Sequence, residues 1–155
     1  MNIRFVKSSE KKQILQDLNE QFGIEKLNYL LIEAGKEKIR GFSGSLSKEE
    51  IQELGRIVNI EVIGLYLIKK ERSKSGKQEL RLSFDSPTLF KTQIAKNIVD
   101  IDDNQLSLWI RGNDLDLESP EGAVIIKHND DFIGCGRSNG LKIFNYVPKD
   151  RRLRK

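Results

Sequence analysis

The fold is decided by residues 124–155, which run VIIKHNDDFIGCGRSNGLKIFNYVPKDRRLRK. Three short runs of β-branched and aromatic residues are separated by two groups of turn-forming residues, at 129–131 and 138–140. Asn, Asp and Gly tolerate positive φ and connect neighbouring antiparallel strands. We therefore predict two consecutive hairpins that end in a basic tail.

Two glycines flank Cys135 in the middle strand of this stretch, Gly134 and Gly136. Glycine weakens a strand but permits a bulge, a tight bend or the close approach of another backbone. A small, strongly curved β-barrel uses glycines in this way. The last third of the chain is therefore expected to form such a barrel.

Upstream of residue 94, helix and strand patterns alternate. Apolar residues at helical spacing predict a helix over 9–22, with Ser8 or Ser9 as N-cap and Gly23 as its stop. Ser47 and Glu50 form a capping box for a second helix, and Ser86-Pro87 begins a short third helix to about 93. Strands are predicted at 3–6, 27–33, 38–42, 61–70, 78–84 and 97–101. The fold class is α+β.

Two motifs near the C-terminus resemble a known module. The runs FIGCGR at 132–137 and KIFNYVPK at 142–149 resemble the end of a PUA or PUA-like domain, most closely the RNA-binding C-terminal domain of NOL/NOP/Sun-type RNA 5-methylcytosine methyltransferases. The element Tyr146-x-Pro148-Lys149, followed by arginine, is the most specific part. The run WIRGNDL at 109–115 is similar to a turn near the start of the same module. The resemblance implies a PUA-like β-barrel with a basic C-terminal tail over 95–155.

The order of elements from Leu65 to Phe90 carries a second resemblance. It is similar to the pre-PUA plus PUA arrangement of archaeal and eukaryotic large-subunit ribosome assembly factors, with agreement at residues 81–83 and a departure at Phe84-Asp85. This resemblance implies an α+β pre-PUA-like domain over 1–94 and no catalytic domain.

Charge is distributed unevenly along the chain. The formal net charge is only +4. Residues 100–131 carry nine acidic side chains against two basic ones, whereas residues 137–155 carry seven basic side chains against one acidic. This asymmetry predicts a positive patch at the C-terminal end. A solvated charged terminus is the alternative.

We predict that this patch binds RNA, because cations neutralise phosphates and aromatic rings beside them stack on unpaired bases. The candidate residues are Arg137, Lys142, Phe144, Tyr146, Lys149, Arg151, Arg152, Arg154 and Lys155. Strand alternation places Phe144 and Tyr146 on one face together with Lys142. The sequence leaves open whether that face meets RNA or forms the barrel core.

The sequence contains no residue pattern typical of a catalytic or metal-binding site. One cysteine and one histidine cannot build an intramolecular disulfide or a four-ligand zinc site. Cys135 lacks the Pro-Cys or Thr-Cys loop of the related methyltransferases and is expected in the barrel wall. His128 is expected at the surface without a partner. No phosphate-loop motif occurs, so we predict no catalytic residue, no metal and no cofactor.

The N-terminus lacks the apolar run of a signal peptide, and no stretch is apolar enough to span a membrane. We therefore expect a cytoplasmic, non-enzymatic RNA-binding protein in rRNA or tRNA maturation or ribosome assembly, which positions RNA for modification. Its partners would be RNA and an RNA methyltransferase or ribosome assembly factor. The alternative is a protein-interaction subunit of a separate RNA methyltransferase, and an enzyme is the third possibility.

Overall fold

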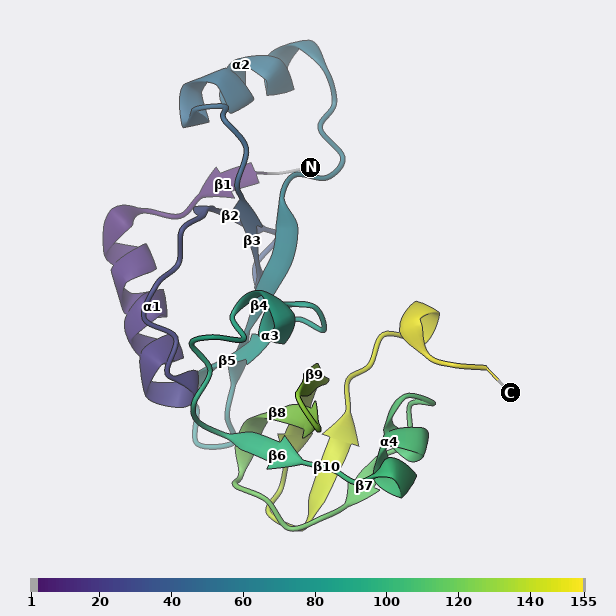
Figure 1. Ribbon diagram of the computed structural model, residues 1–155. Helices are drawn as coiled ribbons and strands as arrows, with labels where there is room; N and C mark the ends of the chain where they lie inside the picture. Colours follow the sequence, from purple (N-terminus) through teal and green to yellow (C-terminus); the bar gives the residue numbers. More distant parts are fainter. Residues whose placement is uncertain (1–2, 155) are drawn as a thin grey trace.

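The computed structural model describes residues 3–154, and within this range the chain forms two five-stranded sheets with helices packed around them (Figure 1). The first sheet has the strand order β1-β2-β3-β4-β5, with antiparallel neighbours throughout. Its strands are β1 (Ile3–Phe5), β2 (Leu30–Ala34), β3 (Lys38–Phe42), β4 (Leu65–Arg72) and β5 (Gln78–Leu82). The predicted α+β class is confirmed, as are both hairpins of this sheet.

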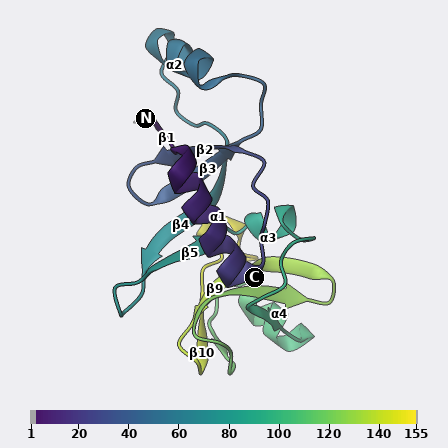
Figure 2. The ribbon, with the colours of Figure 1, turned by 90° about the vertical axis from the view of Figure 1, so that its left-hand side faces the viewer.

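Helix α1 (Ser8–Phe22) lies across one face of the first sheet (Figure 2). Its buried residues Ile14, Leu18 and Phe22 recur at helical spacing and join the main hydrophobic core. The predicted stop at Gly23 is confirmed: this residue has φ 84° and its N–H donates to the carbonyl of Asn19.

The predicted N-cap of α1 is wrong. Lys7, rather than Ser8 or Ser9, has the extended backbone of a cap, with φ −70° and ψ 156°. Its N–H donates to the carboxylate of Glu10 at 2.9 Å. An acidic side chain three residues into the helix thus satisfies the backbone at this end and also suits the helix dipole, so both serines lie inside the first turn.

Helix α2 (Lys48–Ile57) begins with the predicted capping box: Ser47 N–H donates to Glu50 at 2.6 Å, and Glu50 N–H donates to Ser47 Oγ at 3.2 Å. Helix α3 (Ser86–Leu89) is shorter than predicted and its N-cap is Asp85. Ser86 is buried instead, and its hydroxyl donates to the carbonyl of Leu67 at 2.7 Å. The serine therefore ties α3 to β4 rather than capping its own helix.

Strand β4 begins at Leu65 rather than at residue 61, because its pairing with β3 ends where Leu65 faces Gly41. At its other end it continues to Arg72, opposite Gln78. The strand is thus shifted along the chain relative to the prediction, while its partner and orientation are as predicted.

The second sheet has the order β6-β8-β9-β10-β7, with β6 parallel to β8 and all other neighbours antiparallel. Its elements are β6 (Ile98–Asp100), α4 (Asp103–Trp109), β7 (Leu115–Asp116), β8 (Gly122–His128), β9 (Asp131–Ser138) and β10 (Lys142–Asn145). Both hairpins predicted in residues 124–155 are confirmed. A 3-10 helix, η1 (Lys149–Arg151), follows β10.

The second sheet curls around its own core. Trp109 of α4 packs there with Val124, Ile126 and Ile143, and its ring N–H donates to the carbonyl of Ile133 at 2.8 Å. Gly134 supports the curl with φ 100°, in a position where a Cβ atom would lie 2.8 Å from the Phe84 ring. The predicted bend is confirmed at this residue, while its close neighbour is a side-chain ring rather than another backbone.

The two sheets also share buried residues. Ala123, Ile125 and Cys135 on one face of β8 and β9 belong to the same hydrophobic cluster as α1 and the first sheet. The connection near residue 95 is held by hydrogen bonds from Ala95 N–H to Phe22 O and from Asn97 Nδ2 to Gln21 O. The division into domains at 94/95 stays a prediction.

Candidate nucleic-acid interface

The two predicted aromatic residues, Phe144 in β10 and Tyr146 just after it, are partly exposed. Phe144 is 40% exposed and Tyr146 is 37% exposed, whereas Ile143 and Val147 are buried in the core of the second sheet. Side chains alternate between faces along an extended chain. The alternative left open by the sequence is thereby decided: both rings lie on the outer face, not inside the barrel.

Asn145 fixes the backbone between these two rings. Its Nδ2 donates to the carbonyls of Trp109 and Asn113 at 2.8 and 2.9 Å, and its Oδ1 accepts from Val147 N–H at 2.8 Å. Asp114 accepts from the Asn145 N–H at 2.8 Å. The runs at 109–115 and 142–149, which carry the PUA resemblance, therefore meet in space.

Tyr146 also contacts the first sheet. The guanidinium of Arg81 in β5 lies 4.2 Å from the centroid of the Tyr146 ring, within the range of a cation–π interaction. Arg81 Nε donates to Glu71 Oε1 at 2.8 Å. The ring and the cation above it are thus positioned by residues from both sheets.

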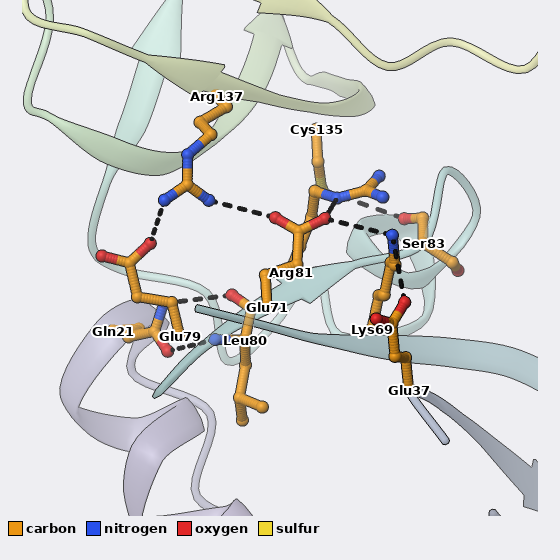
Figure 3. Close-up of polar contacts among 10 residues, drawn as sticks. All are labelled: Gln21, Glu37, Lys69, Glu71, Glu79, Leu80, Arg81, Ser83, Cys135 and Arg137. Carbon is orange, nitrogen blue, oxygen red and sulfur yellow. Dashed lines mark hydrogen bonds and ion pairs between the residues drawn. The ribbon is translucent and has the colours of Figure 1, made fainter. Parts of the chain in front are cut away.

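Glu71 of β4 is the centre of an ionic network between the sheets (Figure 3). Besides Arg81, it accepts from Arg137 Nη1 of β9 at 3.0 Å and lies 3.7 Å from Lys69 Nζ. The other terminal nitrogen of Arg137 donates to Glu79 at 2.8 Å. Arg137, a predicted RNA ligand, therefore has both terminal nitrogens in contact with carboxylates of the first sheet.

An open hollow, which we call the seam hollow, lies next to this network. It is lined by Glu37, Lys69, Lys70, Glu71, Arg72, Arg137 and Tyr146. The contribution of β4 was not predicted, because the predicted cations lie only in residues 137–155. The run KKER at 69–72 in the strand opposite Arg81 is the sequence feature that could have indicated it.

The segment after β10 packs against the rest of the chain and is not the free basic tail that was predicted. Arg151 forms an ion pair with Asp85 at 2.9 Å and lies over the Phe84 ring at 4.9 Å. Arg152 Nε donates to the carbonyl of Val147 at 2.9 Å, and Leu153 N–H donates to the carbonyl of Ile110. The expected release after β10 is wrong, since these contacts fold the segment back onto the domain.

The remaining predicted cations differ in how they are engaged. Lys142 lies 3.7 Å from Asp116 across the β10–β7 pair. Lys149 and Arg154 are exposed and form no ion pair with any residue in the range 3–154. Lys155 lies outside the described residues. Lys149 and Arg154 are therefore the cations of the C-terminal segment most available to an anionic partner.

Cys135 and His128 show no catalytic arrangement. Cys135 is 4% exposed, and burial raises the pKa of its thiol to about 12, which confirms its place in the barrel wall. His128 is not the partnerless surface residue that was predicted, because its Nε2 lies 2.7 Å from Asp103 Oδ1 and its side chain is 16% exposed.

Among the described residues, no group of three or more His, Cys, Asp or Glu side chains could hold a metal ion.

One carboxylate of the acidic residues 100–131 has a structural role: Asp102 Oδ1 accepts from Gln105 N–H at 2.8 Å and caps α4. Over residues 3–154, no helix has the length and apolar character needed to cross a membrane.

The curled second sheet, with α4 packed into it, is consistent with a small PUA-like barrel. Residues 96–153 match the family model described as the methyltransferase RsmF PUA domain. The resemblance found in the sequence to the C-terminal domain of Sun-type methyltransferases is thereby confirmed. The match does not bear on the resemblance to large-subunit assembly factors, which stays a prediction.

Similarity to particular proteins extends over more of the chain. Ribosomal RNA small subunit methyltransferase F from two strains of Vibrio cholerae serotype O1, M66-2 and ATCC 39315 / El Tor Inaba N16961, is 29% identical over 150 residues. The alignments cover 94% of this chain and 30% of each relative. The chain therefore spans about 30% of the length of these curated relatives.

Proposed function

We propose that this chain is an RNA-binding module that positions ribosomal RNA for modification by an RsmF-type methyltransferase. The observation that carries the proposal is the exposure of Phe144 in β10 and of Tyr146 just after it, inside the region that matches the PUA family model. Stacking on aromatic rings beside cations is how proteins hold unpaired RNA bases. The relatives' name supports ribosomal RNA over transfer RNA as the target.

The proposed contact surface combines the two rings with Lys149 and Arg154, the exposed cations of the segment that follows them. Arg137, Arg151 and Arg152 belong to the same positive field, but their guanidinium groups also make structural contacts. Lys142 lies at the edge of this surface, and Lys155 continues it in sequence. We propose phosphate contacts for the exposed cations and base contacts for the rings.

We further propose that these residues have no methyltransferase activity of their own. The support is that the only thiol, Cys135, is buried and held neutral, whereas a nucleophile must be an accessible thiolate. The purified chain should neither bind S-adenosylmethionine nor transfer its methyl group. Saturable binding of that cofactor in a calorimeter would contradict this part of the proposal.

RNA binding itself is tested with a single-stranded RNA oligonucleotide titrated at several salt concentrations. We expect the logarithm of affinity to fall linearly with the logarithm of salt concentration, because phosphate contacts release counterions. Phe144→Ala should weaken binding by roughly 1–3 kcal/mol, the range for loss of one base stack. Leu141→Ala, which truncates an exposed apolar side chain in the turn between β9 and β10, is the matched control.

One observation favours the alternative of a protein-interaction subunit. Exposed apolar side chains gather on α2 and the loop after it, with Ile57 81% and Val62 68% exposed. Patches of this kind occur at protein interfaces. If this is the main function, Ile57→Asp would abolish binding to a methyltransferase catalytic domain, while the chain alone would show weak RNA affinity with little salt dependence.

A further inference from the structure

We propose that the seam hollow binds one unpaired nucleotide of RNA, with its base against Tyr146 and its phosphate among Lys69, Lys70 and Arg72. The inference rests on the proposed RNA-binding function and adds cations of β4, which lie outside the PUA match at 96–153, to Tyr146, which lies inside it. It also predicts that a bound RNA strand contacts both sheets, because β4 supplies the cations and the segment after β10 supplies the ring.

The charge of the hollow favours an anion. Four cations line it against two carboxylates, which gives the lining a net charge of +2 at neutral pH. Glu71 is already shared by Lys69, Arg81 and Arg137. These contacts offset the charge of the cations as well as that of Glu71, and Lys70 and Arg137 also contact Glu33 and Glu79, respectively. Arg72 is therefore the lining cation whose charge no carboxylate of the described chain offsets.

Arg72 is the cation best placed to take the phosphate. It is exposed at the end of β4 and forms no ion pair within the described part of the chain, in contrast to Lys70, which lies 3.1 Å from Glu33. A guanidinium presents several N–H groups in one plane and can bind two phosphate oxygens at once. Lys69 and Lys70 already pair with Glu37 at 3.4 Å and with Glu33 at 3.1 Å, so they would add less to phosphate binding than Arg72.

Tyr146 supplies the surface for the base. The ring borders the hollow and is 37% exposed, and Arg81 lies over it at 4.2 Å. Glu71 holds Arg81 through its Nε, as Figure 3 shows, so this support for the ring is in place before a ligand arrives. A surface that is ordered in advance loses less conformational entropy on binding.

This arrangement favours single-stranded over duplex RNA. In a duplex, the faces of the bases are stacked on one another and are not available to a protein ring. Phosphates, in contrast, are present in both forms. The phosphate contact of β4 should therefore form with RNA probes that lack bases or hold them in a duplex, whereas the base contact of Tyr146 should not.

The test uses the full chain with three probes: a short oligouridylate, an abasic ribose-phosphate oligomer of equal length, and a blunt RNA duplex. Arg72→Gln should weaken binding of all three several-fold and lower the salt slope for the oligouridylate by about 0.7. Tyr146→Leu should weaken oligouridylate binding roughly 5- to 150-fold, the equivalent of one lost base stack, and leave the other two probes nearly unchanged. Tyr146→Phe, which keeps the ring, should bind as the unaltered chain does.

Lys74→Gln is the matched control, because it removes one exposed charge from the same β4–β5 hairpin outside the hollow. If Arg72→Gln and Lys74→Gln have equal effects, the phosphate site is wrong, although RNA binding elsewhere on the chain would stand. Equal losses by Tyr146→Leu on the oligouridylate and the abasic probe would refute the base contact. No binding of any probe by the unaltered chain would overturn both this inference and the proposed function.

Discussion

Arg137 Nη1 donates to Glu71 Oε2 at 3.0 Å and thereby joins β9 of the second sheet to β4 of the first. Both side chains are largely covered, with 25% and 15% of their surface exposed. A second bond from Arg137 to Glu79 doubles the link. This residue, which the sequence placed among the RNA ligands, has a structural position between the sheets.

Replacing Arg137 with Gln should therefore reduce stability. The change leaves the carboxylates of Glu71 and Glu79 without a cation that is now bonded to both, and we expect a loss of about 1–3 kcal/mol in the free energy of unfolding. Lys142→Gln is the control in the same sheet, since its pair with Asp116 is exposed and should contribute less than about 1 kcal/mol. Urea unfolding measures both, and equal effects would contradict the structural role of Arg137.

Local patterns predicted most of the elements. Residues 38–42 form β3 with the predicted bounds, Ser47 and Glu50 form the capping box, and Gly23 ends α1. Each of these depends on residues close together in the chain, whose backbone preferences do not need a tertiary partner. The N-cap of α1 was missed because Glu10 accepts from the Lys7 N–H, so the helix begins one residue before the position that a serine cap would give it.

The candidate site was harder to predict, because its contacts join distant parts of the chain. Arg151 pairs with Asp85, and Arg137 pairs with Glu71, each across 66 residues. Alternation showed that Phe144 and Tyr146 share a face but not which face is covered, since Ile143 and Val147 are apolar as well. Only the packing of Trp109 and Asn145 against this strand decides it.

Cys135 should react with alkylating reagents only when the chain unfolds. Burial raises the pKa of its thiol to about 12, whereas an exposed cysteine has a pKa of about 8.5. The neutral thiol therefore favours the folded state below the unfolded pKa, and this contribution is lost as pH rises toward 12. Iodoacetamide labelling at pH 8 should be slow in buffer and fast in urea. Rapid labelling of the folded chain would show that the thiol is accessible.

The same burial predicts what substitution of Cys135 does. Cys135→Ala should lower the free energy of unfolding by about 1–3 kcal/mol. RNA affinity of the folded fraction should not change, because the thiol lies in the core shared by the two sheets. A thermal unfolding curve shows whether the variant is folded at the temperature of the binding assay. If it is folded there and still binds RNA more weakly, the residue belongs to a binding site.

Glu33 should make the chain sensitive to acid. Its carboxylate is 9% exposed; burial alone would raise its pKa, but hydrogen bonds from Arg4 and Lys70 outweigh this and lower the pKa. A lowered pKa contributes stability above the unfolded value of about 4.3, and this stability is lost as pH falls through the folded value. Glu33→Gln should therefore flatten the loss of stability below about pH 4.

The control for this experiment is Glu25→Gln, which alters an exposed carboxylate that pairs with no cation in the described chain. Thermal unfolding between neutral and acidic pH measures both variants. Glu33→Gln should also be less stable than the unaltered chain at neutral pH, because Arg4 and Lys70 lose their shared partner. If the stability of Glu33→Gln fell more steeply with falling pH than that of the unaltered chain, the ionised Glu33 carboxylate would not favour the folded state.

The salt dependence of RNA binding should be lowered by neutralising Lys149 and Arg154 together. These two exposed cations form no ion pair with residues 3–154. Arg151, in contrast, pairs with Asp85 and Arg152 donates to the carbonyl of Val147, so their neutralisation would also loosen the segment after β10. Each phosphate contact on a single strand contributes about 0.7 to the slope of log affinity against log salt, so the double variant should lose about 1.4. Binding should weaken for all sequences alike, because phosphate contacts do not distinguish bases.

The matched control is the pair Lys12→Gln and Lys48→Gln, which removes the same charge from exposed positions on α1 and α2. The control should leave the slope nearly unchanged, since screening limits the influence of charges more than about 8–10 Å from the bound strand at physiological salt. If the two double variants lower the slope equally, the net charge of the chain drives binding and the C-terminal segment has no special role. An unchanged slope after loss of Lys149 and Arg154 would remove this segment from the RNA interface, leaving the β10 rings and the seam hollow as the surfaces to test.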